Sequence, residues 1–244
     1  MKKTLVFALL AIAAISSADL SISIGIRETG ATGAWGSNGG TGGGIEWVNL
    51  DGQTLVTDGT WQTFTFNFQS DLLTAFAGST ANGAYDGTTG TLEHIRIVNT
   101  GGHTEAMTLW IDDIMTTEPT GAMTTWGDFE SFSAGDEAVF QEAGFSGSTA
   151  GNVLAGSTSA VDDTVSASGL NSSRQDFQFV DGTTSRWIRL TTFNTPNQPN
   201  PLIDFSDGSS LSFKMRSADP VPEPATMTIL GLGALVAAAR KRRK

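Results

Sequence analysis

Short runs in which apolar and polar residues alternate dominate the chain between residues 19 and 218. In "LSISIGI" (20–26) and "TFTFNF" (63–68) every second side chain is apolar, which is typical of a strand with one buried face. Turn signals such as Asp51-Gly52 and Asn82-Gly83 separate these runs, and no segment has a convincing helical period. The pattern predicts an all-β fold, an antiparallel β-sandwich or jelly roll. Further runs of this kind are "LEHIRIV", "MTLWIDDI", "RQDFQFV", "SRWIRLTTF" and "SLSFKM".

The N-terminus has the three parts of a secretory signal peptide. Two lysines precede an apolar run of eleven residues, Leu5 to Ile15, and the small residues Ser16 and Ala18 follow it. We therefore predict a signal peptide over residues 1–18, with cleavage after Ala18 by signal peptidase. A membrane anchor is the alternative, but the run is short for a hydrocarbon core about 30 Å thick.

A second apolar run, residues 225–239, lies near the C-terminus. As a helix its fifteen residues would reach about 22 Å, a short membrane span that a snorkelling arginine would extend. Because Lys and Arg clusters stay on the cytoplasmic side, we expect residues 240–244 inside and residues 19–220 outside. The basic residues of this stop signal are Arg240, Lys241, Arg242, Arg243 and Lys244.

The segment just before this run carries a specific motif, Val221-Pro222-Glu223-Pro224. With the apolar run and the basic end, residues 219–244 resemble the PEP-CTERM sorting signal of Gram-negative bacteria, also catalogued as the ice-binding protein C-terminal domain. The resemblance implies recognition by an exosortase, a membrane cysteine transpeptidase, and a link to extracellular polysaccharide or biofilm. It also implies membrane anchoring by the C-terminus before processing and a cell-surface or extracellular location afterwards. An ordinary tail anchor would leave the Pro-Glu-Pro unexplained.

The body between the two terminal signals is strongly acidic and contains no cysteine. Residues 19–218 carry 7 basic and 23 acidic side chains, a net charge of −16. Nucleic acid is excluded as a partner, because phosphate binding needs clustered Lys and Arg. The lack of cysteine excludes a disulfide framework and thiol chemistry.

Two short motifs suggest how the body is connected. "WGDFESF" and "LWIDDI" resemble the first and last strands of carbohydrate-binding-module-like jelly rolls, where these two strands are neighbours. Here their order is reversed, because "LWIDDI" ends at Ile114 and "DFE" begins at Asp128 after a Thr-rich link, residues 115–127. We interpret residues 19–218 as one sandwich in circularly permuted order; two half-domains are the alternative.

The same resemblance implies a structural calcium ion, held by one acid from each of these two strands. The matching residues are Glu130 and Asp112, and Asp113 is a less certain neighbour. Strict alternation would put Asp113 on the face of Leu109 and Ile111, and Asp112 on the opposite face, so only one aspartate could join the site. Calcium needs six to eight oxygen ligands, which backbone carbonyls would complete. The alternative is that both acids are solvated surface residues. No other cofactor is expected.

Catalytic motifs are missing from the sequence. His94 and His103 lack the spacing of a zinc site, no Gly-x-Ser-x-Gly is present, and "GGTGGG" (39–44) lacks the lysine of a phosphate loop. We therefore expect the protein not to be an enzyme. A secreted hydrolase acting on polysaccharide stays an alternative, since two well-placed carboxylates among the 23 would suffice.

Tryptophans are the strongest indication of binding. Trp faces stack on the apolar faces of sugar rings, and Trp35 and Trp126 lie in segments expected to be exposed. We therefore predict a non-catalytic body that associates with polysaccharide or biofilm. An ice-binding adhesin is a further alternative, but the threonines lack the regular spacing of an ice-binding face. The other tryptophans are expected in the core or on a sheet face: Trp47, Trp61, Trp110 and Trp187.

Overall fold

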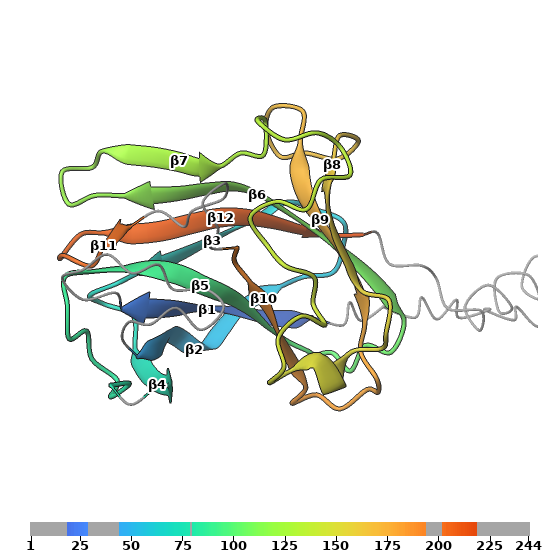
Figure 1. Ribbon diagram of the computed structural model, residues 1–244, viewed down its shortest axis with the longest axis horizontal. Helices are drawn as coiled ribbons and strands as arrows, with labels where there is room; N and C mark the ends of the chain where they lie inside the picture. The colour runs from blue at the N-terminus through green and yellow to red at the C-terminus, as the bar shows by residue number, and fades with distance from the viewer. Residues whose placement is uncertain (1–18, 29–43, 79, 194–201, 219–244) are drawn as a thin grey trace, which may run out of the picture.

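Two antiparallel sheets of six strands pack face to face in the computed structural model, which describes residues 19–28, 44–78, 80–193 and 202–218 (Figure 1). The all-β sandwich predicted from the sequence is therefore confirmed. Within these ranges the helical structure is a single 3₁₀ turn, Ala150–Asn152, and no helix is long and apolar enough to cross a membrane. The predicted signal peptide, the 225–239 helix and Trp35 lie outside the described residues.

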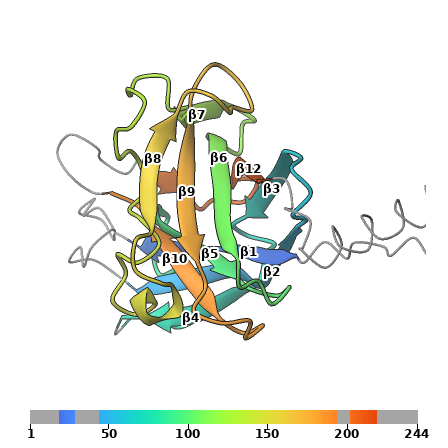
Figure 2. The ribbon, with the colours of Figure 1, turned by 90° about the vertical axis from the view of Figure 1, so that its right-hand side faces the viewer.

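The first sheet, sheet A, has the strand order β10-β5-β1-β2-β4, and β11 pairs with the start of β5. The second, sheet B, has the order β3-β12-β6-β9-β8, and β7 pairs with β6 (Figure 2). The strands of sheet A are β1 (Leu20–Glu28), β2 (Ile45–Leu55), β4 (Leu73–Ala77), β5 (Thr89–Val98), β10 (Trp187–Thr191) and β11 (Ile203–Asp204). Those of sheet B are β3 (Gln62–Asn67), β6 (Ala106–Thr117), β7 (Met123–Gly127), β8 (Thr158–Asp162), β9 (Ser172–Gln178) and β12 (Ser210–Ser217).

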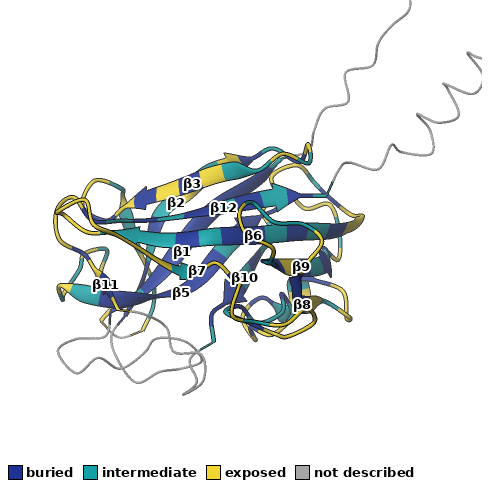
Figure 3. Cartoon of the chain, turned by 90° about the horizontal axis from the view of Figure 1, so that it is seen from above, coloured by how far each residue is buried: buried dark blue, intermediate teal, exposed yellow. Residues whose placement is uncertain are grey.

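The core lies between the sheets and is built from the alternating apolar positions. Strand β1 contributes Ile22 and Ile24, and β3 and β12 contribute Phe64 and Phe213, whose ring centroids lie 5.7 Å apart. Burial of these apolar faces is the main favourable term in folding. Figure 3 shows the central strands, such as β1 and β5, dark blue along most of their length.

A β-bulge in β6 changes the expected alternation. Lys214 of β12 faces Asp112 and Ser212 faces Met115, so β6 has one extra residue, and Asp113 adopts a φ of 51°. The bulge returns Ile114 to the core side, and the prediction that strict alternation holds through this strand is wrong. Asp113 instead faces outward, where its carboxylate pairs with Lys214 at 2.8 Å.

The link expected at residues 115–127 is a β-hairpin. Strand β6 continues to Thr117, the chain turns at residues 118–121, and β7 pairs back along β6 with Gly127 opposite Ile114. A Cβ on Gly127 would lie 2.6 Å from the Ile114 side chain, so glycine permits this close pairing. The hairpin brings "DFE", at the end of β7, beside "LWIDDI". The two motifs lie side by side, but the strand expected over "WGDFESF" ends at Gly127.

Strands from both halves of the chain contribute to each sheet. In sheet A, β10 and β11 pair with β5, and in sheet B, β3 pairs with β12. The buried side chains of both halves form one hydrophobic cluster. Neither half can therefore complete a sheet alone. This arrangement agrees with one sandwich over residues 19–218; the circular permutation remains an interpretation.

We expect residues 19–218 to unfold in one cooperative transition, because the strands of each half need partners from the other. Thermal and denaturant melts, followed by circular dichroism and by tryptophan fluorescence, should coincide. The isolated fragment 128–218 should not fold, since β10, β11 and β12 would lose β5, β6 and β3. Two separate transitions, or a stable fragment, would contradict the interwoven sandwich.

Candidate functional site

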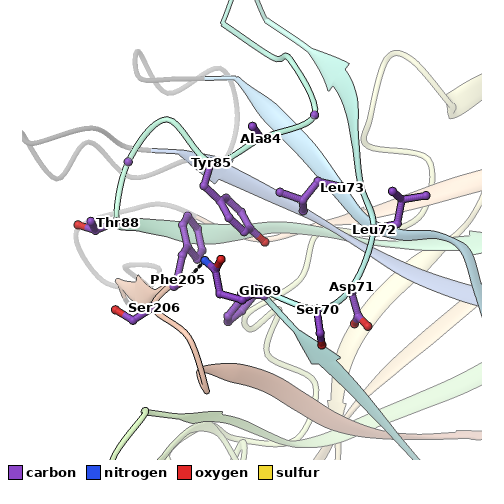
Figure 4. Close-up of a pocket in the computed structure, with 13 residues that line it drawn as sticks. Gln69, Ser70, Asp71, Leu72, Leu73, Ala84, Tyr85, Thr88, Phe205 and Ser206 are labelled. Atoms are coloured by element: carbon purple, nitrogen blue, oxygen red, sulfur yellow. Dashed lines mark hydrogen bonds between the residues drawn. The ribbon is translucent and has the colours of Figure 1, made fainter.

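A pocket of about 560 Å³ opens where the β3–β4 turn, the loop before β5 and the residues after β11 meet (Figure 4). Its size lies within the range of small-molecule sites, about 300–1,000 Å³. Its wall combines aromatic rings with hydroxyl, amide and carboxylate groups. The residues that line it are Phe68, Gln69, Ser70, Asp71, Leu72, Leu73, Gly83, Ala84, Tyr85, Gly87, Thr88, Phe205 and Ser206.

Three aromatic rings contribute to the apolar part of the pocket. Tyr85 stacks on Phe205, with ring centroids 4.3 Å apart and planes 22° apart, and Phe68 packs against both. Phe68 and Phe205 are buried to 1% exposure, whereas Tyr85 is half-buried. The core thus fixes the two phenylalanines, and they hold the tyrosine ring in place at the pocket.

The Tyr85 hydroxyl is the most distinctive polar group of the pocket. It points between Leu73 and Gln69 in Figure 4, and it is buried without a hydrogen-bond partner in the described part of the chain. Burial, followed by the charges of nearby carboxylates, raises the pKa of Tyr85 above its usual value. The hydroxyl therefore stays protonated, and it is an unsatisfied hydrogen-bond donor at the pocket wall.

Two buried glutamates hold the loop that carries Tyr85. Glu46 of β2 accepts hydrogen bonds from the backbone N–H groups of Asn82 at 2.8 Å and Gly83 at 3.1 Å. Glu28 of β1 accepts from the N–H groups of residues 86 and 87. These bonds satisfy backbone N–H groups of a loop that is not paired with a strand, and so they hold the pocket wall in place.

The two acids proposed for calcium hold a different loop, residues 167–171, in the same way. The structure brings Asp112 and Glu130 to this one loop, where each accepts two backbone N–H bonds. For Asp112 the donors are Ala167 at 2.8 Å and Ser168 at 3.1 Å; for Glu130 they are Leu170 at 2.8 Å and Asn171 at 2.9 Å. Asp112 is fully buried, whereas Glu130 is exposed. The solvated-surface alternative is therefore wrong for Asp112.

The carboxylates at this loop do not form a larger cluster. No group of three or more His, Asp or Glu side chains in the described ranges could hold a metal ion. Burial raises the pKa of Asp112, although the N–H donors of Ala167, Ser168 and Asp113 oppose this. The arrangement accounts for both acids as loop anchors, and calcium binding stays a prediction.

Trp126 does not occupy the exposed link that the sequence predicted. It lies in β7, half-buried and packed against the hydrophobic core. Its indole N–H is buried with no partner within the described residues. The expectation that Trp126 presents an open ring to a sugar is corrected, because the hairpin turns this residue onto the sandwich.

The sequence analysis did not identify the pocket. Tyr85 is the only tyrosine of the chain and lies in "NGAYDGTTG", a turn-rich segment like those around Trp35 and Trp126. An aromatic residue among turn residues was therefore an available signal. Phe205 and Gln69 gave no such signal, since only the fold brings residues 68–73, 83–88 and 205–206 together.

The C-terminal residues 220–244 match the family model of the PEP-CTERM protein-sorting motif. This motif marks an exported protein that an exosortase sorts to the cell surface. Searches of curated proteins and of solved structures found no match. The matched residues lie outside the described ones, so the membrane helix at 225–239 and the basic tail stay predictions.

Proposed function

We propose that the sandwich of this exosortase-sorted protein is a non-catalytic module that associates with extracellular polysaccharide, as a component of the biofilm matrix. The sorting motif supports the location, and the aromatic pocket with the unpartnered Tyr85 hydroxyl carries the binding role. The wall of the pocket suits a sugar, because the half-buried Tyr85 ring can pack against a C–H face while amide and hydroxyl groups of the wall hydrogen-bond to the sugar hydroxyls.

The acids of the pocket favour binding over hydrolysis. Glycoside hydrolysis ordinarily uses two carboxyl groups about 5–9.5 Å apart. Asp71 supplies the only carboxylate among the lining residues, and it already accepts the Asn67 backbone N–H at 2.9 Å. A bound sugar would therefore meet one hydrogen-bonding acid and no acid–base pair in this pocket.

The sorting motif follows the last strand of the sandwich after only a few residues. Strand β12 ends at Ser217, and Pro222 follows five residues later, a distance of at most about 18 Å. Ala218 donates a hydrogen bond to the Thr108 carbonyl, and Asp19 accepts one from Thr100, so both ends of the body lie beside the β5–β6 connection. We infer that signal peptidase and exosortase both act beside this one end of the sandwich.

Changing Tyr85 to Phe is expected to weaken binding of polysaccharide about five- to tenfold, the effect of losing one neutral hydrogen bond. The ring and its stacking on Phe205 remain, so stability should change little. Titration calorimetry of residues 19–218 with extracellular polysaccharide from the producing cells measures the change. Thr184→Val, which removes an exposed hydroxyl at the opposite end, is the control. Equal affinities for wild type and Tyr85→Phe would show that the Tyr85 hydroxyl takes no part in binding and would contradict the pocket as the binding site.

A further inference from the structure

The outer face of sheet A is positively charged, although the body as a whole is acidic. Arg27 of β1, Arg96 of β5 and Arg189 of β10 lie on the face turned away from sheet B, because they alternate with core residues. Three of the seven basic side chains of the body are thus gathered on one face. Glu93 is the one carboxylate paired with them in the described ranges.

His94 adds no positive charge to this face. It is fully buried over Gly25, where a Cβ would overlap the imidazole ring. Its Nε2 accepts the indole N–H of Trp47 at 3.1 Å, and its Nδ1 donates to Glu93. Burial lowers the pKa of His94, and an Nε2 that accepts a hydrogen bond belongs to the neutral ring.

Both carboxylate oxygens of Glu93 are engaged by neighbouring side chains. Its Oε1 accepts a hydrogen bond from Arg189 and lies 3.8 Å from the guanidinium of Arg27, while its Oε2 bonds to His94. Burial opposes ionisation of Glu93, but the bonds to His94 and Arg189 hold the pKa of its carboxyl below the ordinary value. The Glu93 carboxylate therefore pairs with Arg27 and Arg189, and it does not pair with Arg96.

Of the three arginines on this face, Arg96 is the one with no acidic partner among the residues that the structure describes. Its Nη1 donates to the Leu50 carbonyl at 3.1 Å and lies 3.4 Å from the Ser23 hydroxyl, and its Nε is buried without a partner in the described part of the chain. Its guanidinium lies 5.1 Å from the ring centroid of Trp47 and 5.3 Å from that of Trp187. The rings stabilise the cation but do not neutralise it.

An uncompensated, half-buried arginine is costly unless a ligand completes it, and its planar fork fits a carboxylate. Trp47, Trp187 and Arg96 are all half-buried, so they remain accessible at the surface. Resting on the polysaccharide-binding role proposed above, we propose that Arg96 and these two tryptophans bind an acidic sugar. The carboxylate of a uronic acid unit pairs with Arg96. The sugar lies against the exposed edges of the two tryptophans, because the Trp47 ring is stacked on Phe76, with ring centroids 4.3 Å apart, and also carries the Arg96 guanidinium.

The probe is polygalacturonate, compared with its methyl ester, which has the same backbone without the charge. Residues 19–218, which contain every described strand, should bind the acid form more tightly than the ester by about ten- to hundredfold, the effect of a charge-assisted hydrogen bond. This preference should shrink at high salt, since ions screen the pair. Arg96→Gln should bind both forms equally. Arg174→Gln, on the outer face of sheet B, should keep the preference.

The outcomes separate this site from the pocket. Tyr85→Phe should weaken both forms alike, whereas Arg96→Gln should abolish only the preference for the acid. If Arg96→Gln does not fold, Arg96→Lys keeps the charge but loses the fork, and a reduced preference is expected. No preference in the wild type, or an undiminished one in these variants, would overturn the proposal. These outcomes do not decide the proposed function, which is tested by titration with the polysaccharide of the producing cells.

Discussion

The Glu223→Ala variant is expected to stay in the membrane with its C-terminal tail uncut. Glu223 is the only charged residue of the tripeptide, and the flanking Pro222 and Pro224 restrict the backbone to extended conformations. An enzyme that reads the tripeptide therefore has one charged group to recognise, and alanine removes it. Cell fractionation and mass analysis of the C-terminus measure the result.

The neighbouring acid gives a matched control for this change. Asp219 lies four residues before Glu223 but outside the tripeptide, so Asp219→Ala should be processed like the wild type. The same mature C-terminus in Glu223→Ala and in wild type would contradict the sorting role of the tripeptide.

Asp112→Ala should lower the free energy of unfolding of the body by about 3 kcal/mol or more. This is the largest stability effect that we expect from replacing one buried acid. The buried carboxylate accepts backbone N–H groups of Ala167 and Ser168, and that of Asp113 at 2.7 Å. Alanine leaves all three without an acceptor. Denaturant melts measure the loss. Glu130→Ala is the comparison, because Glu130 is exposed and should cost only about 1 kcal/mol. Equal stability of the two variants would contradict the anchoring role of Asp112.

The same melts test the calcium prediction. A calcium ion held by Asp112 and Glu130 would bind the folded state and raise its melting temperature by mass action. Wild type should then melt higher with calcium than with a chelator, and the double alanine variant should be insensitive. Identical wild-type curves would leave the two acids with their loop-anchoring role alone.

The sequence pattern predicted well the strands that bury every second side chain in the core, including the edge strand β3. The period-2 runs at β1, β3, β5, β9 and β12 correspond to strands in the structure. Two edge strands were missed: β4 has only half-buried or exposed residues, and β8 follows a long turn-rich segment. The bulge at Asp113 was also missed, since an extra residue leaves no mark on a local pattern.

The candidate sites show a different limit. Glu28, Glu46 and Asp112 look like ordinary acids in an acidic chain, yet each is buried and holds a loop through backbone N–H groups. Which acid is buried depends on the register of strands far apart in sequence. The face around Arg96 likewise combines residues of β1, β2, β5 and β10, and no local spacing could have revealed it. The sorting motif was visible because an enzyme reads it as a contiguous peptide.

Calorimetric titration of purified residues 19–218 with the extracellular polysaccharide of the producing cells decides whether the sandwich is a glycan-binding module. We expect saturable binding that weakens in Tyr85→Phe, with no release of reducing sugar during prolonged incubation. The absence of binding by a cooperatively folded body would contradict the proposed role. Release of reducing sugar would instead show that the sandwich is a hydrolase.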